Sequence, residues 1–379
     1  MSKIYLDHNA TTPVAHEVCE LMLKHLSSEW GNPSSTYSFG AKLKSDIEAS
    51  RRVIAEFVNC MSSEVIFTGS ATESINTALW SATESAKGAK VIATTAVEHS
   101  ATLSFCSNSQ RRGIKTIQIG VDSNGNLIKD QISQALEAKP SLISLMWVNN
   151  ETGVIFPVEE LSQACLERGI SLHVDAVQAA GKIQISFNNY PGITYLSLSA
   201  HKFNGPKGVG ILVARKSAPY IPLISGGHQE RGRRGGTENV AGIIGTGMAA
   251  SLASRDIKQR HQKAVKLRAI LEEGISRIHP KAVINGKLAN RVPNTTSVTF
   301  PGIESESLLL MLDKDGICAS SGSACLADAE EASHVIKAMH PDTTLGRETV
   351  RLSTGPSNTE EELNETLASL ERSIKRLSK

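Results

Sequence analysis

Short apolar runs and stretches with helical spacing alternate along the first half of the chain. Apolar runs that end in polar residues predict strands within residues 64–76, 90–95, 141–153 and 170–182. Between the strands, hydrophobic residues recur at helical spacing in residues 40–58, and a further helix is expected at about 157–168. This alternation predicts an α/β fold whose mainly parallel sheet, of a seven-stranded type, is sandwiched by helices.

The second half of the chain has a different pattern. A Gly/Arg-rich loop at 221–240 precedes a long helix that is expected to begin at about 256. A strand at 295–300 and further helices follow, and Thr359 and Glu362 have the spacing of a capping box. We therefore expect three parts: an N-terminal arm at 1–15 that packs with the small domain, a large domain at 16–255 and a small α+β domain at 256–379.

The composition argues against a nucleic-acid-binding, a secreted or a membrane-spanning protein. The 379 residues carry 40 basic and 38 acidic side chains, a balance that argues against direct binding of nucleic acid. The N-terminus lacks the apolar core of a signal peptide, and no run approaches the roughly 18 apolar residues of a membrane helix. A cytoplasmic protein without membrane contact is expected. The six cysteines include no CxxC pair, which favours neither a metal site nor disulfides, and most are expected to be buried.

Several polar residues stand where the predicted strands end, namely Thr72, His99, Asn150, Asp175 and Lys202. Ligands of parallel sheets bind beyond the carboxyl ends of the strands, so these side chains are expected to share one site. A lysine amine that loses its proton can attack a carbonyl, and the aldehyde most often captured in this way is that of pyridoxal phosphate (PLP). An exposed loop lysine is the alternative for Lys202 taken alone.

Other residues could supply the remaining parts of a PLP site. Asp175 could keep the pyridine nitrogen protonated, although a helix N-cap is an equal alternative. His99 could stack on the ring and move protons, or be structural. The helix start at Ala71 and Thr72 could bind a phosphate group. Further candidate ligands are Gln178 for the phenolate oxygen and Ser199 and His201 for the phosphate.

Cys325 lies in SSGSAC, among small residues that suggest an accessible thiol in a mobile loop. An accessible thiol that forms a thiolate is a nucleophile, whereas a buried cysteine before a helix is the alternative. Arg351, in VRLSTG, could bind a substrate carboxylate through its planar guanidinium group, or be solvated at a strand end.

Together these residues resemble the NifS/IscS-type cysteine desulfurases, which are fold type I PLP enzymes of the class V aminotransferase group. Ten motifs occur in that family's order: YLDHNATTP, GNPSS, ATES, EHSA, VNNETG, VDAVQAAGK, SAHKFNGPKG, GGHQERGRRGGT, SSGSAC and RLSTG. The SSGSAC context is similar to the group with a long mobile catalytic loop. Two motifs depart from the commoner family pattern, in Gly69-Ser70 and in RLSTG.

The resemblance implies a role for each residue. Lys202 would hold PLP covalently, Asp175 would pair with its ring nitrogen, Gln178 with its phenolate, and His99 would stack on the ring. Thr72, Ser199 and His201 would hold the phosphate, and Thr237 would reach the phosphate bound by the partner of a homodimer. Arg351 would bind the carboxylate of the substrate L-cysteine, helped by Asn32 and Asn150, and Cys325 would take the sulfur.

The function implied is the conversion of L-cysteine to L-alanine, with persulfide sulfur delivered to a protein acceptor that docks near Cys325. Iron–sulfur scaffolds, tRNA thiolation enzymes and the DNA phosphorothioation machinery are acceptors used in the family. The chain stops at Lys379, soon after its last amphipathic helix, which favours a specialised member over a housekeeping one. The alternatives are a selenocysteine lyase, an aminotransferase of the same fold, or a non-catalytic docking protein.

Overall fold

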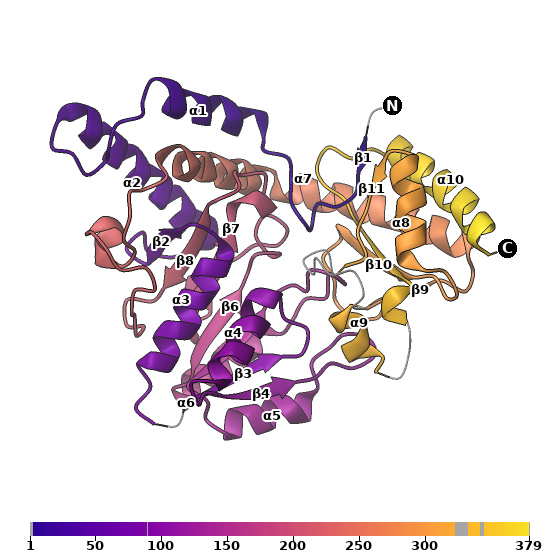
Figure 1. Ribbon diagram of the computed structural model, residues 1–379, viewed down its shortest axis with the longest axis horizontal. Helices are drawn as coiled ribbons and strands as arrows, with labels where there is room; N and C mark the ends of the chain where they lie inside the picture. The colour runs from indigo at the N-terminus through magenta and orange to yellow at the C-terminus, as the bar shows by residue number, and fades with distance from the viewer. Residues whose placement is uncertain (1–2, 89, 323–332, 342–344, 379) are drawn as a thin grey trace.

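The computed structural model describes residues 3–88, 90–322, 333–341 and 345–378. Its centre is a seven-stranded sheet with the strand order β2-β8-β7-β6-β5-β3-β4 (Figure 1). All neighbouring pairs among β4, β3, β5, β6 and β7 are parallel, whereas β8 is antiparallel to both β2 and β7. The predicted mainly parallel α/β sheet is therefore confirmed. The strands are β2 (Val65–Thr68), β3 (Val91–Thr95), β4 (Lys115–Ile119), β5 (Leu142–Met146), β6 (Ser171–Asp175), β7 (Ile193–Ser199) and β8 (Gly210–Ala214).

Helices cover both faces of this sheet. Successive side chains of a strand point to opposite faces, and in β2 Val65 and Phe67 belong to one hydrophobic cluster while Ile66 belongs to another. The Ile66 cluster includes α3 and α4, and the Val65 cluster includes α2, α6 and the first half of α7. The helices of this part are α1 (His16–Ser27), α2 (Ser38–Val58), α3 (Ala71–Glu84), α4 (Ser100–Gln110), α5 (Lys129–Glu137) and α6 (Val158–Arg168).

The C-terminal part has its own core and smaller sheets. Strand β10 (Thr295–Thr299) pairs antiparallel with β9 (Val283–Ile284) and β12 (Thr349–Ser353). The N-terminal arm joins this part, because β1 (Ile4–Tyr5) pairs in parallel with β11 (Ile317–Cys318). The helices of this part are α8 (Ser305–Lys314), α9 (His334–Met339) and α10 (Glu360–Leu377), and the predicted capping box at the start of α10 is present.

Helix α7 (Val240–Ile278) corrects the sequence prediction, because it begins about sixteen residues before the expected start at 256. Its first half is rich in glycine and alanine and is buried on most sides against α1 and α2. Gly247, for instance, lies so close to Ser50 that a Cβ atom would be 2.9 Å from the Ser50 Cβ. Its second half contributes Leu267, Leu271 and Ile275 to the C-terminal core. A segment buried all round lacks the amphipathic period that identifies a surface helix.

The Gly/Arg-rich loop is held to the large domain by one buried ion pair. Glu230, with a positive φ of 48°, accepts hydrogen bonds from Arg51 Nη1 at 2.6 Å, Arg51 Nη2 at 2.8 Å and the Phe67 backbone N–H at 3.0 Å. Both charged side chains are almost fully buried, at 4% and 3% exposure. The pair therefore fixes the loop against α2 and β2.

Replacing Glu230 with glutamine is expected to lower the free energy of unfolding by about 3 kcal/mol, because it leaves the buried Arg51 charge with only the partly exposed Glu48 carboxylate as counter-ion. Urea denaturation measures the change. The matched control is Glu371→Gln, which removes an exposed carboxylate that pairs with Lys375 on α10 and should leave the transition midpoint unchanged. Equal midpoints for the two variants would contradict this account of the loop.

Cysteine burial differs from the expectation. Of the five cysteines in the described residues, Cys106 and Cys165 are buried, Cys60 and Cys318 are half-buried and Cys19 is exposed. The prediction that most are buried is therefore wrong, because three of these five cysteines lie at positions that solvent reaches. Among the described residues, no helix combines the length and apolar content that a membrane span requires.

Candidate active site

A cavity of about 310 Å³ lies at the carboxyl ends of the central strands, where the alternation of strands and helices predicted a site. Asp175 ends β6, Ser199 ends β7, and His99 and Asn150 follow β3 and β5. Ten of the residues singled out in the sequence line this one cavity: Ala71, Thr72, His99, Asn150, Asp175, Gln178, Ser199, His201, Lys202 and Arg351. The structure thus brings together residues that are up to 280 positions apart in the chain.

Lys202 ends a short 3-10 helix, η2 (Ala200–Lys202), directly after β7. Its Nζ donates hydrogen bonds to the backbone oxygens of Asn9 at 2.6 Å and Ala10 at 2.7 Å. Both Asn9 and Ala10 line the cavity, so the N-terminal arm forms part of the site. These arm residues were not predicted to form part of the site, although the polar run in YLDHNATTP is a signal that could have indicated it.

Asp175 is the buried acid of the site. Its Oδ1 accepts a hydrogen bond from the Val177 backbone N–H at 2.9 Å, so the residue caps a turn and does not begin a helix. Burial raises the pKa of Asp175 to about 6, and the nearby Lys202 charge only partly opposes this. A cationic group beside the carboxylate would stabilise its charged form, which suits a protonated pyridine nitrogen.

The start of α3 provides a place for a phosphate group. Ser70 is the N-cap and accepts a hydrogen bond from the Glu73 backbone N–H at 3.2 Å, while the first helical residues line the cavity. Strand β8 approaches so closely that a Cβ atom on Gly210 would lie 2.2 Å from the Ser70 carbonyl carbon. Unpaired N–H groups of a first helical turn and the helix dipole attract phosphate.

Arg351 and Asn150 form the opposite wall. Arg351 donates from Nη1 to the Asn150 backbone oxygen at 3.1 Å and from Nη2 to Asp7 Oδ1 at 2.7 Å. Arg351 Nε and Asn150 Oδ1 are buried and have no hydrogen-bond partner among the described residues. Because an unmade buried hydrogen bond is unfavourable, these atoms favour a polar ligand, and the guanidinium group fits a carboxylate.

His99 and His201 are both neutral at neutral pH in this cavity. Burial, together with the Lys202 charge, lowers the pKa of each to about 4. His99 Nδ1 accepts a hydrogen bond from the Ala101 backbone N–H at 3.1 Å, which places the proton of the neutral ring on Nε2. His201 Nδ1 lies 3.0 Å from Thr11 Oγ1, so the arm also orients this ring.

Gln178 is held within the protein. Its Nε2 donates to the Asn9 backbone oxygen at 2.8 Å, and its Oε1 accepts a hydrogen bond from Lys182. The Gln178 side chain is therefore buried and hydrogen-bonded rather than exposed to solvent.

Three predicted site residues are not among those that line the cavity. Thr237 lines a separate cavity of about 210 Å³ with Arg234 and Glu230. Asn32 is exposed, and its Oδ1 accepts a hydrogen bond from the Ser34 backbone N–H at 2.9 Å. Cys325 lies outside the described residues. Gly322, three positions earlier in the sequence, lines the cavity.

The comparison with known families agrees with this geometry, because the model of the aminotransferase class-V family matches residues 4–365. The chain belongs to the aminotransferase class-V family. Within it, the chain is 43% identical over 369 residues to a cysteine desulfurase of Gluconacetobacter diazotrophicus, covering 97% of this chain and 92% of the relative. The predicted family, the NifS-type cysteine desulfurases, is thereby confirmed.

Solved structures of class-V relatives share the whole fold. A NifS-like protein superposes with a TM-score of 0.91 at 36% identity, covering 99% of this chain and all of the other. The protein SspA, solved in complex with cysteine, superposes with a TM-score of 0.83 at 30% identity and covers 94% of this chain and all of the other. Class-V enzymes of this kind depend on PLP, and the buried acid, the helix start and the lysine described above fit that cofactor.

A second buried acid lies behind the class-V site. Glu98 Oε1 accepts hydrogen bonds from Thr95 Oγ1 at 2.6 Å and the Met146 backbone N–H at 3.0 Å, whereas Oε2 is buried without a partner among the described residues. Burial raises the pKa of Glu98 to about 8, helped by the Asp175 charge. The folded protein therefore keeps Glu98 protonated at neutral pH.

Glu98→Gln is expected to change how stability depends on pH in the cofactor-free protein. The unfolded carboxyl titrates near 4.5 and the folded one near 8, so the wild type loses stability as the pH rises between these values. The variant has no carboxyl group at this position to ionise. Its free energy of unfolding should therefore rise relative to that of the wild type, by on the order of a few kcal/mol, as the pH increases from 4.5 to 8. Urea denaturation at several pH values measures it, with exposed Glu137→Gln as control; parallel pH profiles for Glu98→Gln and the wild type would refute the assignment.

Proposed function

We propose that this protein converts L-cysteine to L-alanine with PLP as cofactor and leaves the sulfur as a persulfide on Cys325. The observation that carries the proposal is that one cavity joins an amine at Lys202, a buried acid at Asp175 and an arginine with an unpaired Nε at Arg351. Relatives of the same family are named cysteine desulfurases, and a similar structure was solved with cysteine.

Different residues of the cavity bind the substrate and transfer its protons. PLP, when bound, supplies an electron sink that makes the Cα proton of an amino acid acidic. Arg351 holds the carboxylate of cysteine, and the buried Asn150 Oδ1 accepts a hydrogen bond from the amino group of the substrate. The Lys202 amine, once deprotonated, takes the Cα proton, and Asp175 holds a proton at the ring nitrogen. Neutral His99 donates or accepts a further proton above the same cavity.

Cys325 carries out the step at sulfur. Its thiolate attacks the sulfur of the substrate cysteine, an S–S bond forms and the C–S bond breaks. The electron pair of the broken bond remains with the substrate carbon, which is then protonated to give alanine. The sulfur leaves the site as a persulfide on Cys325 and passes to a protein acceptor.

The acceptor belongs to one of three systems in this proposal: an iron–sulfur scaffold, tRNA thiolation or DNA phosphorothioation. The enzyme acts in the cytoplasm, and the acceptor docks near the segment that carries Cys325. Selenocysteine lyase activity is the second candidate, because selenocysteine differs from cysteine only in carrying selenium in place of sulfur. Incubating the PLP-loaded protein with L-cysteine or L-selenocysteine and measuring alanine decides between them; no alanine from either substrate would reject the proposal.

A homodimer is part of the same proposal. Thr237 and Arg234 line a cavity separate from that of Lys202, which suits a role toward the cofactor of a second copy. We expect a two-fold dimer in solution and a loss of PLP affinity in Thr237→Val, because one hydroxyl donor to the phosphate is removed. Sedimentation velocity and PLP titration measure both; a fully active monomer would contradict the dimer.

A further inference from the structure

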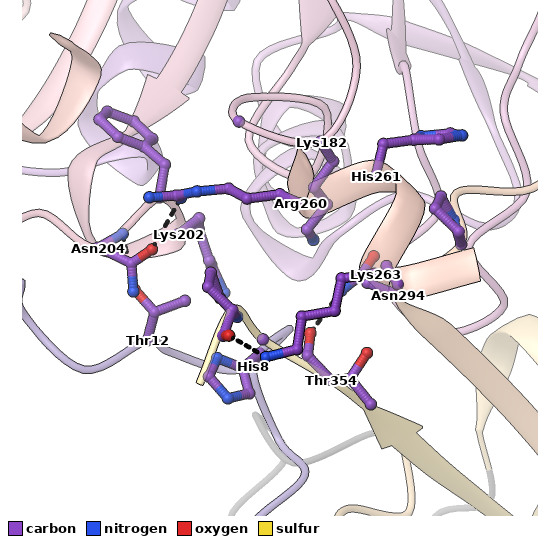
Figure 2. A pocket seen from close by; sticks show the side chains of 16 residues that line it. His8, Thr12, Lys182, Lys202, Asn204, Arg260, His261, Lys263, Asn294 and Thr354 are labelled. Carbon is purple, nitrogen blue, oxygen red and sulfur yellow. Dashed lines mark hydrogen bonds between the residues drawn. The ribbon is translucent and has the colours of Figure 1, made fainter. Parts of the chain in front are cut away.

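A third cavity, which shares Lys202 with the active-site cavity, is lined by residues of the arm, the large domain and the C-terminal part (Figure 2). It offers about 60 Å³ and is lined by residues of the arm, the turn after β6, α7 and the segments beside β10 and β12. Six of the lining residues are basic and none is acidic: His8, Lys182, Lys202, Arg260, His261 and Lys263. Such a uniform sign of charge in a semi-enclosed space favours an anion.

The donors that face the cavity have capacity left for a ligand. Arg260 donates from Nη1 to Asn204 Oδ1 at 3.1 Å, and its Nη2 lies 3.8 Å from Asp256 Oδ2, which is outside the cavity lining. Lys263 Nζ donates to the Pro356 backbone oxygen at 2.6 Å. A guanidinium group carries five N–H donors and an ammonium group three. Figure 2 shows Arg260 extending towards Asn204 and Lys263 extending towards His8 from neighbouring turns of α7.

His8 is an independent sign of a missing partner. Its side chain is only 3% exposed, and neither ring nitrogen has a hydrogen-bond partner among the described residues. It lies against the backbone of Gly355, where a Cβ atom would be 2.0 Å from its Cε1. A neutral imidazole has one N–H donor, and leaving it unpaired in the interior is unfavourable.

The cations also destabilise one another in this space. Burial, followed by the charges of Lys202 and Arg351, lowers the pKa of Lys182 well below its usual value. Burial and then the Lys182 charge lower the pKa of His8 to about 4, which the nearby Tyr5 backbone only partly opposes. Burial also lowers the pKa of Arg260, against the opposing effect of the Asp256 charge. A bound negative charge would offset each of these effects.

We propose that this cavity, lined by His8, Arg260 and Lys263, is a binding site for a small oxyanion, separate from the phosphate and carboxylate positions of the active site. The space holds a group of a few non-hydrogen atoms, since one water needs about 10–15 Å³. Phosphate, sulfate and a free carboxylate share the required chemistry, because guanidinium and ammonium groups donate to their oxygens. The site does not depend on the proposed desulfurase activity.

Isothermal titration of the PLP-loaded protein with sodium phosphate, sulfate or acetate, at constant ionic strength in chloride, tests the proposal. Loading with PLP keeps the phosphate position of the active site filled. The pocket variant is Arg260→Gln/Lys263→Gln. The matched control is Arg255→Gln/Lys266→Gln, which removes two exposed cations from the same helix, outside the cavity.

We expect saturable binding with one ion per chain in the wild type and the control, weakened about tenfold or more in the pocket variant. Tighter binding of phosphate and sulfate than acetate would identify a tetrahedral oxyanion, and the reverse a carboxylate. Circular dichroism and melting without added anion check folding; if the double variant is unstable, Lys263→Gln is compared with Lys266→Gln. Equal affinities of pocket and control variants, or no saturable binding above chloride, would overturn the proposal.

Discussion

Lys202→Ala is expected to abolish covalent attachment of PLP and to lower turnover of L-cysteine by about 10³-fold or more, because it removes both the attachment point and the base of the site. The fold should persist, since the Lys202 amine donates to the backbone oxygens of Asn9 and Ala10, and these oxygens can bind water instead. Reduction with borohydride followed by mass spectrometry measures the attachment.

Lys207→Ala is the matched control for Lys202, because Lys207 lies five positions later in the same segment and is exposed. It should retain attachment and turnover. If Lys202→Ala still carried PLP that borohydride fixes to the chain, the lysine would have been assigned wrongly. If Lys202→Ala lacked covalently attached PLP but kept full turnover, the proposal that Lys202 acts as the base would be refuted.

Cys325→Ser is expected to bind PLP and L-cysteine normally and to release essentially no alanine or sulfide. A serine hydroxyl keeps nearly the same size but forms no anion near neutral pH, whereas the step at sulfur needs a thiolate nucleophile. Alanine formation and persulfide labelling measure the two halves of the reaction. Because Lys202 acts at Cα and Cys325 at sulfur, the two variants should fail at different steps.

Cys19→Ser serves as the control for Cys325→Ser, since Cys19 is an exposed thiol on α1 and is not among the residues that line the cavity. It should keep full sulfur transfer, as should alanine variants of the four other cysteines. Full turnover by Cys325→Ser would remove the persulfide mechanism and favour a lyase or transaminase. Loss of turnover in both serine variants would instead indicate that thiols stabilise the protein in general.

The sequence predicted the strands and the residues at their ends because both signals are local. The run VIATT, for example, consists of three apolar residues and two β-branched threonines over the length of β3, and His99 lies four residues after it. What the sequence did not predict is carried by long-range contacts. Arg351 donates a hydrogen bond to Asp7, which lies 344 positions earlier in the sequence, and Lys202 donates one to Asn9, which lies 193 positions earlier. No local pattern encodes such pairs, so the arm was expected to pack with the small domain but not to line the site.

The start of α7 was missed for a different physical reason. Residues 240–255 are mostly small or aliphatic and are buried on several sides, so they have no polar face to mark a helical period. Charged residues appear regularly only after Arg255, where the helix meets solvent, and the predicted start lies at that change. The same burial that hides the helix in the sequence lets α1 and α2 pack closely on it.

This shared helix has a consequence for cooperativity. Ala249, Ala250 and Ala253 belong to the core of the large domain, and Leu267 and Leu271 belong to the C-terminal core, yet one continuous run of backbone hydrogen bonds joins them. Melting either core frays a helix that the other core needs. The two cores should therefore denature in a single transition, and a fragment that ends at 255 should aggregate on expression, because half of α7 and its partners would be missing.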